Sequence, residues 1–210
     1  TALARTQSHP EWIVKALRQA LATHGRSGDE LEALLAADNV DPEVVLCARP
    51  GLIAPEALAK VARKADRAHD VEPRPGRISP LAVVMVGGDP GRIEAIRDCR
   101  AGVEDEGSQL VALVAAHAPV EGRDARWLDL CAGPGGKAAL LAARAAQTGA
   151  QLLANEVSPH RADLVRSALR AIAPDVARVR CGDGRDLGRD EPGAYDRVLV
   201  DAPCTGLGSL

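Results

Sequence analysis

Short apolar segments alternate with helical ones through the second half of this chain, and no other feature limits its possible folds as strongly. Four strands are predicted, at 125–130, 150–157, 176–181 and 195–202. Helices are predicted before and between them, at 106–118, 135–147 and 158–172. Strands that alternate with helices form a parallel sheet, because the chain must cross over the sheet between consecutive strands. The second half is therefore predicted to be an α/β domain.

The first hundred residues have a different, α+β pattern. Helices are predicted at 10–23, 31–37 and 54–65, and strands at 42–49 and 80–88. The change of pattern near residue 100 predicts two regions. Residues 1–100 are a linker helix followed by a small α+β domain, and residues 101–210 are the N-terminal part of a Rossmann-like domain.

Overall charge and aromatic content argue against a general nucleic-acid binder. The net charge is −3 and the sequence pI is about 6.0, so any binding to a polyanion must use a local patch. The aromatic residues are only Trp12, Trp127 and Tyr195. So few aromatic side chains argue against a protein that binds single strands by stacking bases on them. One looser basic segment is a candidate for phosphate contacts: Arg63, Lys64, Arg67, Arg74 and Arg77.

The cysteine pattern predicts a reduced, cytoplasmic protein without a metal site. The five cysteines show no C-x-x-C spacing and their number is odd: Cys47, Cys99, Cys131, Cys181 and Cys204. No apolar run is long enough to span a membrane.

A glycine turn follows the first strand of the α/β domain, in "LDLCAGPGGKAALLAA" (128–143). Glycines at a strand-to-helix turn let the backbone approach a ligand at the carboxyl end of the strand, although a tight connection alone could also explain them. Two better-known motifs do not fit. The P-loop fails because Cys131 stands at its first glycine and Ala138 follows Lys137, and G-x-G-x-x-G fails because its third glycine is missing.

Acidic residues stand at the ends of the next three strands: Glu156, Asp183 and Asp201. Each one alone could be a helix N-cap or an exposed loop residue. The carboxyl ends of parallel strands meet at one edge, where an acid about 20 residues after a glycine turn binds ribose hydroxyls. As an aligned set they favour a nucleoside-type ligand without a pyrophosphate.

Three motifs give the chain a resemblance to a known family. "LDLCAGPGGK", "GDGRD" and "DAPCTGLGS" resemble those of the Sun (Fmu) family of RNA (cytosine-5) methyltransferases, in particular its ribosomal small-subunit members. "GVEDEGSQLVAL" is similar to the family's entry into the catalytic domain, and "HPEWIVKAL" to its linker into the RNA-binding part. The chain departs from the family at Gly133, where Ala is usual, and a turn is expected to tolerate that change.

The resemblance implies a Rossmann-like S-adenosylmethionine-dependent methyltransferase, preceded by a small α+β RNA-binding domain. It implies that Glu156 holds the ribose, Asp183 contacts the adenine, and Asp201 lies near the methionyl end and the target base. The segment that wraps the cofactor is Cys131, Ala132, Gly133, Pro134, Gly135, Gly136 and Lys137. Lys137 by itself could equally be a solvated helix residue.

By the same resemblance Cys204 assists product release. In the family, a thiolate adds to carbon-6 of cytosine and activates carbon-5 towards the sulfonium methyl. The attacking cysteine belongs to a later motif that this sequence lacks. Such domains usually have seven strands, and four are predicted here. We therefore expect a portion of a longer protein, with the C-terminal part of the domain truncated, that binds the cofactor and does not turn over alone.

The expected partner is small-subunit ribosomal RNA, and the expected state is a monomer in the cytoplasm. Two alternatives remain. One is a non-catalytic cofactor- or RNA-binding module, which methyl transfer by the parent protein would exclude. The other is a dinucleotide oxidoreductase, which the broken G-x-G-x-x-G makes less favourable.

Overall fold

The computed structural model describes residues 2–40, 43–65, 72–85 and 88–203. The chain separates into two compact units between residues 42 and 43. In the first unit, three helices pack around Val14, Leu31 and Leu35: α1 (Ala2–Thr6), α2 (Glu11–Thr23) and α3 (Glu30–Asp38). The sequence predicted α2 and α3, whereas α1 was missed.

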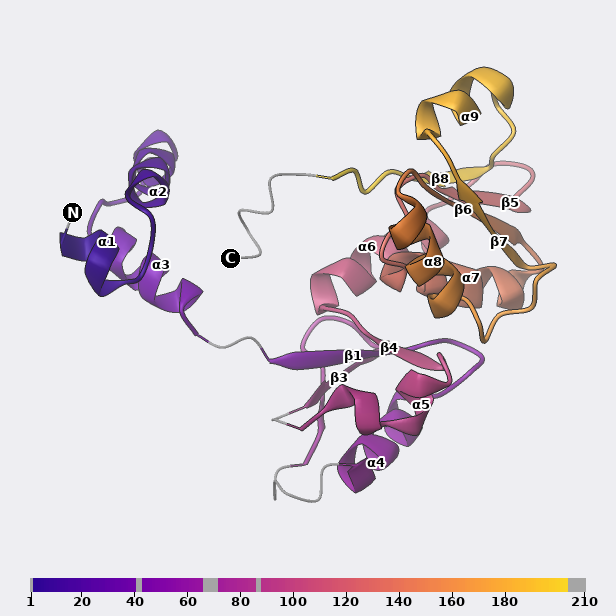
Figure 1. The fold of residues 1–210 in the computed structure, drawn as a ribbon, viewed down its shortest axis with the longest axis horizontal. Helices are drawn as coiled ribbons and strands as arrows, with labels where there is room; N and C mark the ends of the chain where they lie inside the picture. The colour runs from indigo at the N-terminus through magenta and orange to yellow at the C-terminus, as the bar shows by residue number, and fades with distance from the viewer. Residues whose placement is uncertain (1, 41–42, 66–71, 86–87, 204–210) are drawn as a thin grey trace. The chain divides into compact units, whose positions relative to one another are not determined.

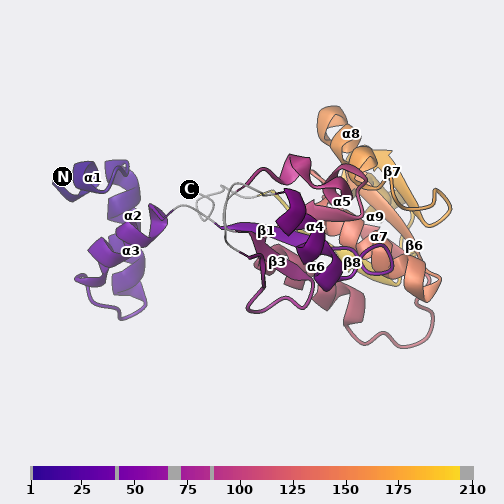
Figure 2. The same ribbon diagram turned by 90° about the horizontal axis from the view of Figure 1, so that it is seen from below.

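The second unit begins with an antiparallel sheet in the order β2-β3-β1-β4. Its strands are β1 (Val44–Ala48), β2 (Arg74–Pro75), β3 (Ala82–Met85) and β4 (Ala101–Val103). The helices α4 (Pro55–Ala65) and α5 (Glu94–Arg97) pack on this sheet, and a 3-10 turn, η1 (Pro90–Arg92), precedes α5 (Figure 2). Leu46, Leu58 and Val83 lie in the core between them. This part has the predicted α+β character.

Strand β4 follows the predicted division at residue 100 but belongs to the first sheet. Its residues Ala101, Gly102 and Val103 pair with β1. No strand was predicted here, because three residues are too few to show an alternating pattern. Strand β4 is the last strand of the first sheet, and the chain continues from it into α6 and the second sheet. The domain division near residue 100 remains a prediction.

The second sheet is parallel throughout and has the order β7-β6-β5-β8. Its strands are β5 (Arg126–Asp129), β6 (Gln151–Glu156), β7 (Ala177–Cys181) and β8 (Arg197–Leu199). Four helices accompany them: α6 (Glu106–His117), α7 (Gly136–Thr148), α8 (Pro159–Ala168) and α9 (Gly184–Asp190). The predicted α/β fold with a parallel sheet is thereby confirmed, and α9 is the one helix among these that the sequence did not predict.

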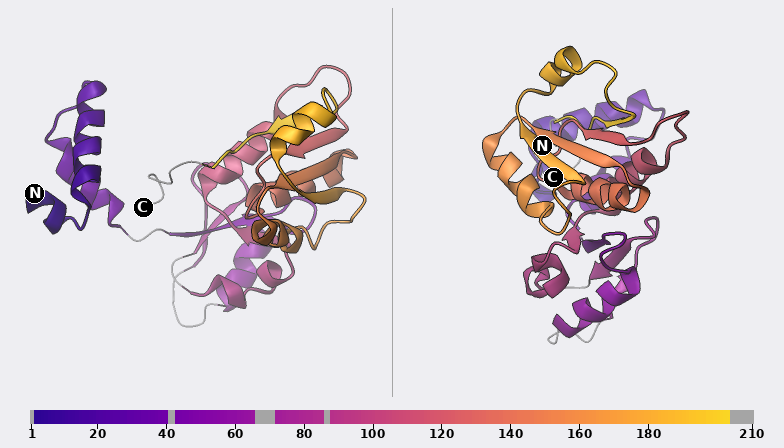
Figure 3. Two further views of the ribbon diagram at one scale, coloured as in Figure 1. Left: turned by 45° about the horizontal axis from the view of Figure 1, so that its top comes forward. Right: turned by 90° about the vertical axis from the view of Figure 1, so that its right-hand side faces the viewer.

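Strand order determines which helices share a face of this sheet. The chain steps from β5 to β6 to β7 in one direction, so right-handed crossovers place α7 and α8 on the same face. It then returns past β5 to β8, and this reversal places α9 on the other face (Figures 1 and 3). The sheet is therefore wound on both sides, as in an open α/β fold.

The two faces of the second sheet are buried to different extents. On the face of α6, α7 and α8, Trp127 and Leu152 pack against a run of alanines such as Ala139. On the face of α9, Val198 and Val200 are 53% and 56% exposed. No helix in the described part of the chain is both long and apolar enough to cross a membrane.

Helix α6 and a buried arginine connect the two sheets. The side chain of Gln109, on α6, is fully buried and donates to the backbone oxygen of Leu46 at 3.4 Å and to that of Glu104 at 2.7 Å. The guanidinium of Arg49, which follows β1, donates to the backbone oxygens of Cys99 at 2.5 Å and Ala168 at 2.7 Å. Because Ala168 is the last residue of α8, the first sheet is joined to a helix that contacts the glycine turn.

Candidate functional site

A cavity of about 210 Å³ lies where the strand order reverses, at the carboxyl ends of β5 and β8. Open α/β sheets bind ligands at this kind of reversal, because the loops that follow the two strands diverge there. The lining residues come from the glycine turn, from the start of α6 and from the two strand ends: Val103, Glu104, Asp105, Ser108, Asp129, Cys131, Ala132, Gly133, Pro134, Gly136, Lys137 and Asp201. Most of the predicted cofactor-wrapping segment is therefore at this cavity.

The glycines of the turn allow three close approaches. Gly135 has φ +113°, and a Cβ there would lie 2.8 Å from the Ala168 Cβ. A Cβ on Gly136 would lie 3.2 Å from the carboxyl carbon of Glu104. A methyl group at Gly133, the residue that departs from the family, would require the Glu156 side chain to move, because its Oε2 would be 2.5 Å away. The turn thus brings α7 against α8 and against the cavity wall.

Lys137 and Asp201 meet across the cavity. The Lys137 ammonium forms an ion pair with Asp201 at 2.8 Å and donates to the Ser108 hydroxyl at 3.1 Å. Lys137 is therefore not a freely solvated helix lysine. It is placed at the reversal point as the cation of an otherwise acidic cavity.

Asp129, the last residue of β5, is a buried acid. It is 1% exposed, and neither carboxylate oxygen has a partner of good geometry among the described residues. Burial raises its pKa to about 7, and the nearby Cys131 backbone N–H and Lys137 charge offset only part of that effect. A buried group of this kind is costly to leave unsatisfied, which is typical of a ligand site.

Glu104 is a second acid in the same wall. Its Oε1 is buried and has no hydrogen-bond partner in the described part of the chain. Burial raises its pKa to about 7 as well, against the opposing charges of Lys137 and Arg49. The cavity therefore contains two acids that are poised to change charge near neutral pH.

Glu156 lies at the predicted edge of the sheet, below the glycine turn and outside the cavity lining. Its side chain is 4% exposed and forms an ion pair with Arg161 at 3.7 Å. It accepts hydrogen bonds from the backbone N–H groups of Gly133 at 3.0 Å and Ser158 at 2.9 Å. Each carboxylate oxygen can accept a second bond. In this structure Glu156 organises the turn, and its contact with a ribose stays a prediction.

Asp183 follows β7 and caps α9. It accepts from the Arg185 backbone N–H at 2.9 Å and from the Arg185 guanidinium at 2.5–3.0 Å. The Arg185 side chain is the main cause of a pKa for Asp183 of about 2. Because Asp183 is exposed and Arg185 is a surface residue, the carboxylate is accessible to a ligand at the sheet edge, although it does not line the cavity.

Of the two cysteines that the sequence assigned to the site, Cys131 lines the cavity. Burial, together with the carboxylates of Asp129 and Glu156, raises the pKa of Cys131, which disfavours a thiolate there. Cys204, which the sequence assigned to product release, lies outside the described residues.

The predicted basic segment is not one continuous patch. Arg63 forms an ion pair with Glu72 at 2.7 Å, and Arg74 forms one with Glu43 at 2.6 Å. Arg67 lies outside the described residues. Lys64 and Arg77 are exposed and make no ion pair with any residue that the structure describes.

Sequence reasoning missed Asp129, Glu104 and Ser108. Asp129 carried a signal, since it is a charged residue inside an apolar strand immediately before a glycine turn. Glu104 and Ser108 carried none, because they reach the cavity only through the packing of α6 between the two sheets.

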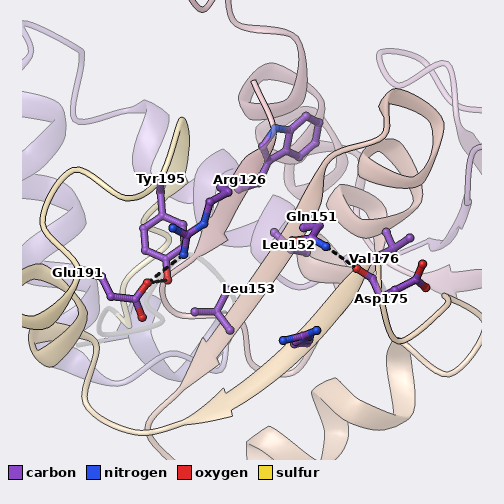
Figure 4. Close-up of a pocket in the computed structure, with 10 residues that line it drawn as sticks. Arg126, Gln151, Leu152, Leu153, Asp175, Val176, Glu191 and Tyr195 are labelled. Carbon is purple, nitrogen blue, oxygen red and sulfur yellow. Dashed lines mark hydrogen bonds and ion pairs between the residues drawn. The ribbon is translucent and has the colours of Figure 1, made fainter. Parts of the chain in front are cut away.

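A second cavity, of about 230 Å³, lies towards the amino ends of the strands (Figure 4). Its polar groups largely satisfy one another. Arg126 forms an ion pair with Glu191 at 3.0 Å and lies over the Tyr195 ring, and the Tyr195 hydroxyl donates to Glu191 at 3.0 Å. The carboxyl-end cavity, with its unsatisfied acids, is the better candidate site. Over the described residues, no group of three His, Cys, Asp or Glu side chains could hold a metal ion.

Comparison with known proteins gives a family match to one part of the chain. The family model described as 16S rRNA methyltransferase RsmB/F matches residues 115–210, which include the parallel sheet. A Mycobacterium tuberculosis protein whose name calls it a methyltransferase is 50% identical over 207 residues, which cover 99% of this chain and 42% of that protein.

A further relative names its substrate. The ribosomal RNA small subunit methyltransferase B of Xanthomonas campestris is 32% identical over 210 residues, covering 99% of this chain and 44% of that enzyme. The chain thus spans less than half the length of these relatives. Among solved structures, NSun6 from Pyrococcus horikoshii with SFG has the same fold, with a TM-score of 0.70 at 15% identity over 94% of this chain and 71% of that one.

Proposed function

We propose that the chain binds S-adenosylmethionine in the methylation of carbon-5 of a cytosine in small-subunit ribosomal RNA, because the model of the 16S rRNA methyltransferase RsmB/F family matches residues 115–210. The observation that carries the proposal is the cavity at the strand reversal, which combines a glycine turn with buried, unsatisfied carboxyl groups. In this proposal the chain acts as a monomer in the cytoplasm.

The residues present fit the cofactor. S-adenosylmethionine carries an ammonium and a sulfonium, and the unpartnered oxygens of Asp129 and Glu104 are acceptors for cationic groups. The cavity, about 210 Å³, is smaller than the roughly 300–1,000 Å³ of a complete ligand pocket. We therefore place the methionyl part in the cavity and the nucleoside along the sheet edge towards Glu156 and Asp183. The SFG bound to the NSun6 structure, a S-adenosylmethionine analogue, supports the choice of cofactor.

Each group of the chain has a part in this proposal. When bound, the cofactor supplies the methyl group. The backbone of the turn from Cys131 to Lys137 binds the cofactor. Lys137 and Asp201 orient the target base of the RNA against the cofactor. Cys204 assists release of the product, and the thiolate that attacks carbon-6 belongs to a different motif of the family.

We expect Asp183→Ala to weaken S-adenosylmethionine binding by about 1–3 kcal/mol, because it removes a polar partner of the adenine. The same change removes the N-cap of α9, so Asp183→Ser is the matched variant: it can keep the cap while losing the carboxylate. Calorimetric titration of both variants separates the two effects. Equal affinity in wild type and both variants would remove Asp183 from the site.

Methyl transfer from labelled cofactor to ribosomal RNA tests the function itself. We expect a full-length relative to transfer the methyl group and the 210-residue chain to bind cofactor without transfer, in wild type and Cys204→Ala alike. Methyl transfer by the chain that disappears in Cys204→Ala would instead make Cys204 the attacking nucleophile.

The alternative of a dinucleotide oxidoreductase has its own test. Tighter binding of NAD than of S-adenosylmethionine in calorimetry would favour the oxidoreductase.

A further inference from the structure

One carboxylate of α6 holds a loop of the first sheet in place. The backbone N–H groups of Arg77, Ile78 and Ser79 donate to Glu106 at 3.0, 2.7 and 2.8 Å. These three bonds, with that of Ser79 foremost, lower the pKa of Glu106. The Ser79 hydroxyl also donates to the buried side-chain oxygen of Gln109 at 2.6 Å. We call residues 76–79 the rim loop; its backbone is fixed by an unusually complete set of bonds for an exposed segment.

The rim loop is attached to the same turns of α6 that form one wall of the candidate cavity. Asp105 and Ser108 line the cavity. Glu106 and Gln109, which bind the rim loop, are the residues that follow them in the chain.

Two side chains of the rim loop are directed to solvent rather than into the protein. Arg77 is exposed and has no ion-pair partner among the described residues, and Ile78 is 60% exposed. Val103, which lines the cavity, is also 56% exposed. Exposed apolar side chains that occur singly need no explanation. Here Val103 lines the cavity, and Ile78 lies beside Arg77 on the loop that α6 holds. We call Arg77, Ile78 and Val103 the rim surface.

Charge indicates which partner fits the rim surface. The cavity is lined by the acids Glu104, Asp105, Asp129 and Asp201 and by one cation, Lys137, so its field repels a polyanion. An RNA strand that brings a base to this cavity therefore needs a cation at the rim, and Arg77 supplies one.

We propose that the rim surface binds the RNA strand next to the target base, with Arg77 on a backbone phosphate and Ile78 and Val103 against the neighbouring nucleotides. This inference rests on the proposed function and adds the position of the substrate. Glu106 acts as a positioning residue, because a loop that is already ordered binds without the entropic cost of ordering it.

Two substitutions test the surface by different signatures. In fluorescence anisotropy with a labelled 12-nucleotide single-stranded RNA, Arg77→Ala is expected to weaken binding by about five- to tenfold and to lower the slope of log K against log salt by about 0.7, the value for one phosphate contact. Ile78→Ser is expected to weaken binding about threefold with an unchanged slope, because it removes only apolar contact. The control is Arg178→Ala, an exposed arginine at the second cavity that should change neither quantity.

Glu106→Gln gives a prediction whose sign separates positioning from charge. Removing a carboxylate strengthens binding to a polyanion if only charge matters. If Glu106 positions the rim loop, Glu106→Gln instead weakens RNA binding about threefold or more and speeds hydrogen exchange at the amides of residues 77–79. Tighter RNA binding in this variant would overturn the positioning role.

The outcomes distinguish this inference from the proposed function. Suppose that the wild type binds both S-adenosylmethionine and RNA, and that Arg77→Ala has the same RNA affinity and salt slope. That result would overturn the rim surface and leave the proposed function unaffected. A wild-type chain that binds the cofactor but not RNA would overturn the rim surface together with the RNA part of the function. Cofactor affinity within twofold of wild type in all three variants is the expected result.

Discussion

Gly135→Ala is expected to lower the free energy of unfolding by about 2–5 kcal/mol and to abolish cofactor binding. The residue has φ +113°, which an L side chain rarely adopts, and that strain costs about 1–3 kcal/mol. Its new methyl would also lie 2.8 Å from the Ala168 Cβ and 3.1 Å from the Val165 Cα, so α7 and α8 would have to separate. Because the turn lines the cavity, the same shift displaces the proposed cofactor site.

The same helix provides the control. Gly149 ends α7 as Gly135 begins it, has φ +76°, and has nothing within 4 Å of an added Cβ. Gly149→Ala therefore carries the strain without the clash, and we expect it to cost about 1–2 kcal/mol and to leave cofactor affinity unchanged. Urea denaturation and calorimetry of both variants give the comparison. Equal destabilisation in the two would mean that close packing of α7 on α8 is not what requires Gly135.

Asp129→Asn is expected to stabilise the protein above pH 7 while it weakens S-adenosylmethionine binding at least about tenfold. The pKa of Asp129 is raised to about 7 from an ordinary 3.8, so the folded state keeps its proton between these values while the unfolded state loses it. Stability from this group is therefore greatest near pH 4, falls as the pH rises, and is lowest above about pH 7. The full difference is on the order of 4 kcal/mol.

Asparagine has the shape of the protonated acid and no charge to lose. The variant should match the wild type at or below about pH 4 and exceed it by about 2–4 kcal/mol at pH 8, measured by urea midpoints at several pH values. Asp175→Asn, an exposed aspartate at the second cavity, is the control and should leave the pH dependence unchanged. A variant with the wild-type pH profile would show that Asp129 is not a buried, protonated acid.

The cofactor effect has its own measurement. A cationic ligand favours the ionised carboxylate, so wild-type affinity should rise between pH 6 and pH 8, with proton release detectable in buffers of different ionisation enthalpy. Asp129→Asn should lose that rise. A more stable protein that binds its ligand less well is the trade-off expected where an acid is kept unsatisfied for binding. Unchanged affinity at pH 8 would exclude Asp129 from the site.

The local features of the site were determined by sequence. Strands at 125–130, 150–157, 176–181 and 195–202 were predicted from apolar segments between turns, and all four are present. Three are shorter by one or two residues, and β8 has three residues where eight were predicted. Their alternation with helices predicted a parallel sheet, because a crossover leaves few other arrangements. That in turn placed Glu156, Asp183 and Asp201 at one edge. Short elements such as β4 and α9 were missed, because a few residues carry too little pattern.

Only the tertiary structure decided the chemical state of those groups and which of them meet. Burial depends on what covers a residue, so the position of Asp129 inside an apolar strand could suggest a buried acid, whereas the absence of a partner for its carboxylate among the described residues follows only from the packing around it. Glu104 reaches the cavity, and Glu106 the rim loop, only because α6 packs between two sheets that are distant in the chain. Hydrogen-bond periodicity and turn chemistry act over a few residues and are readable in the sequence. Desolvation and charge proximity act through space, and they exist only once the chain has folded.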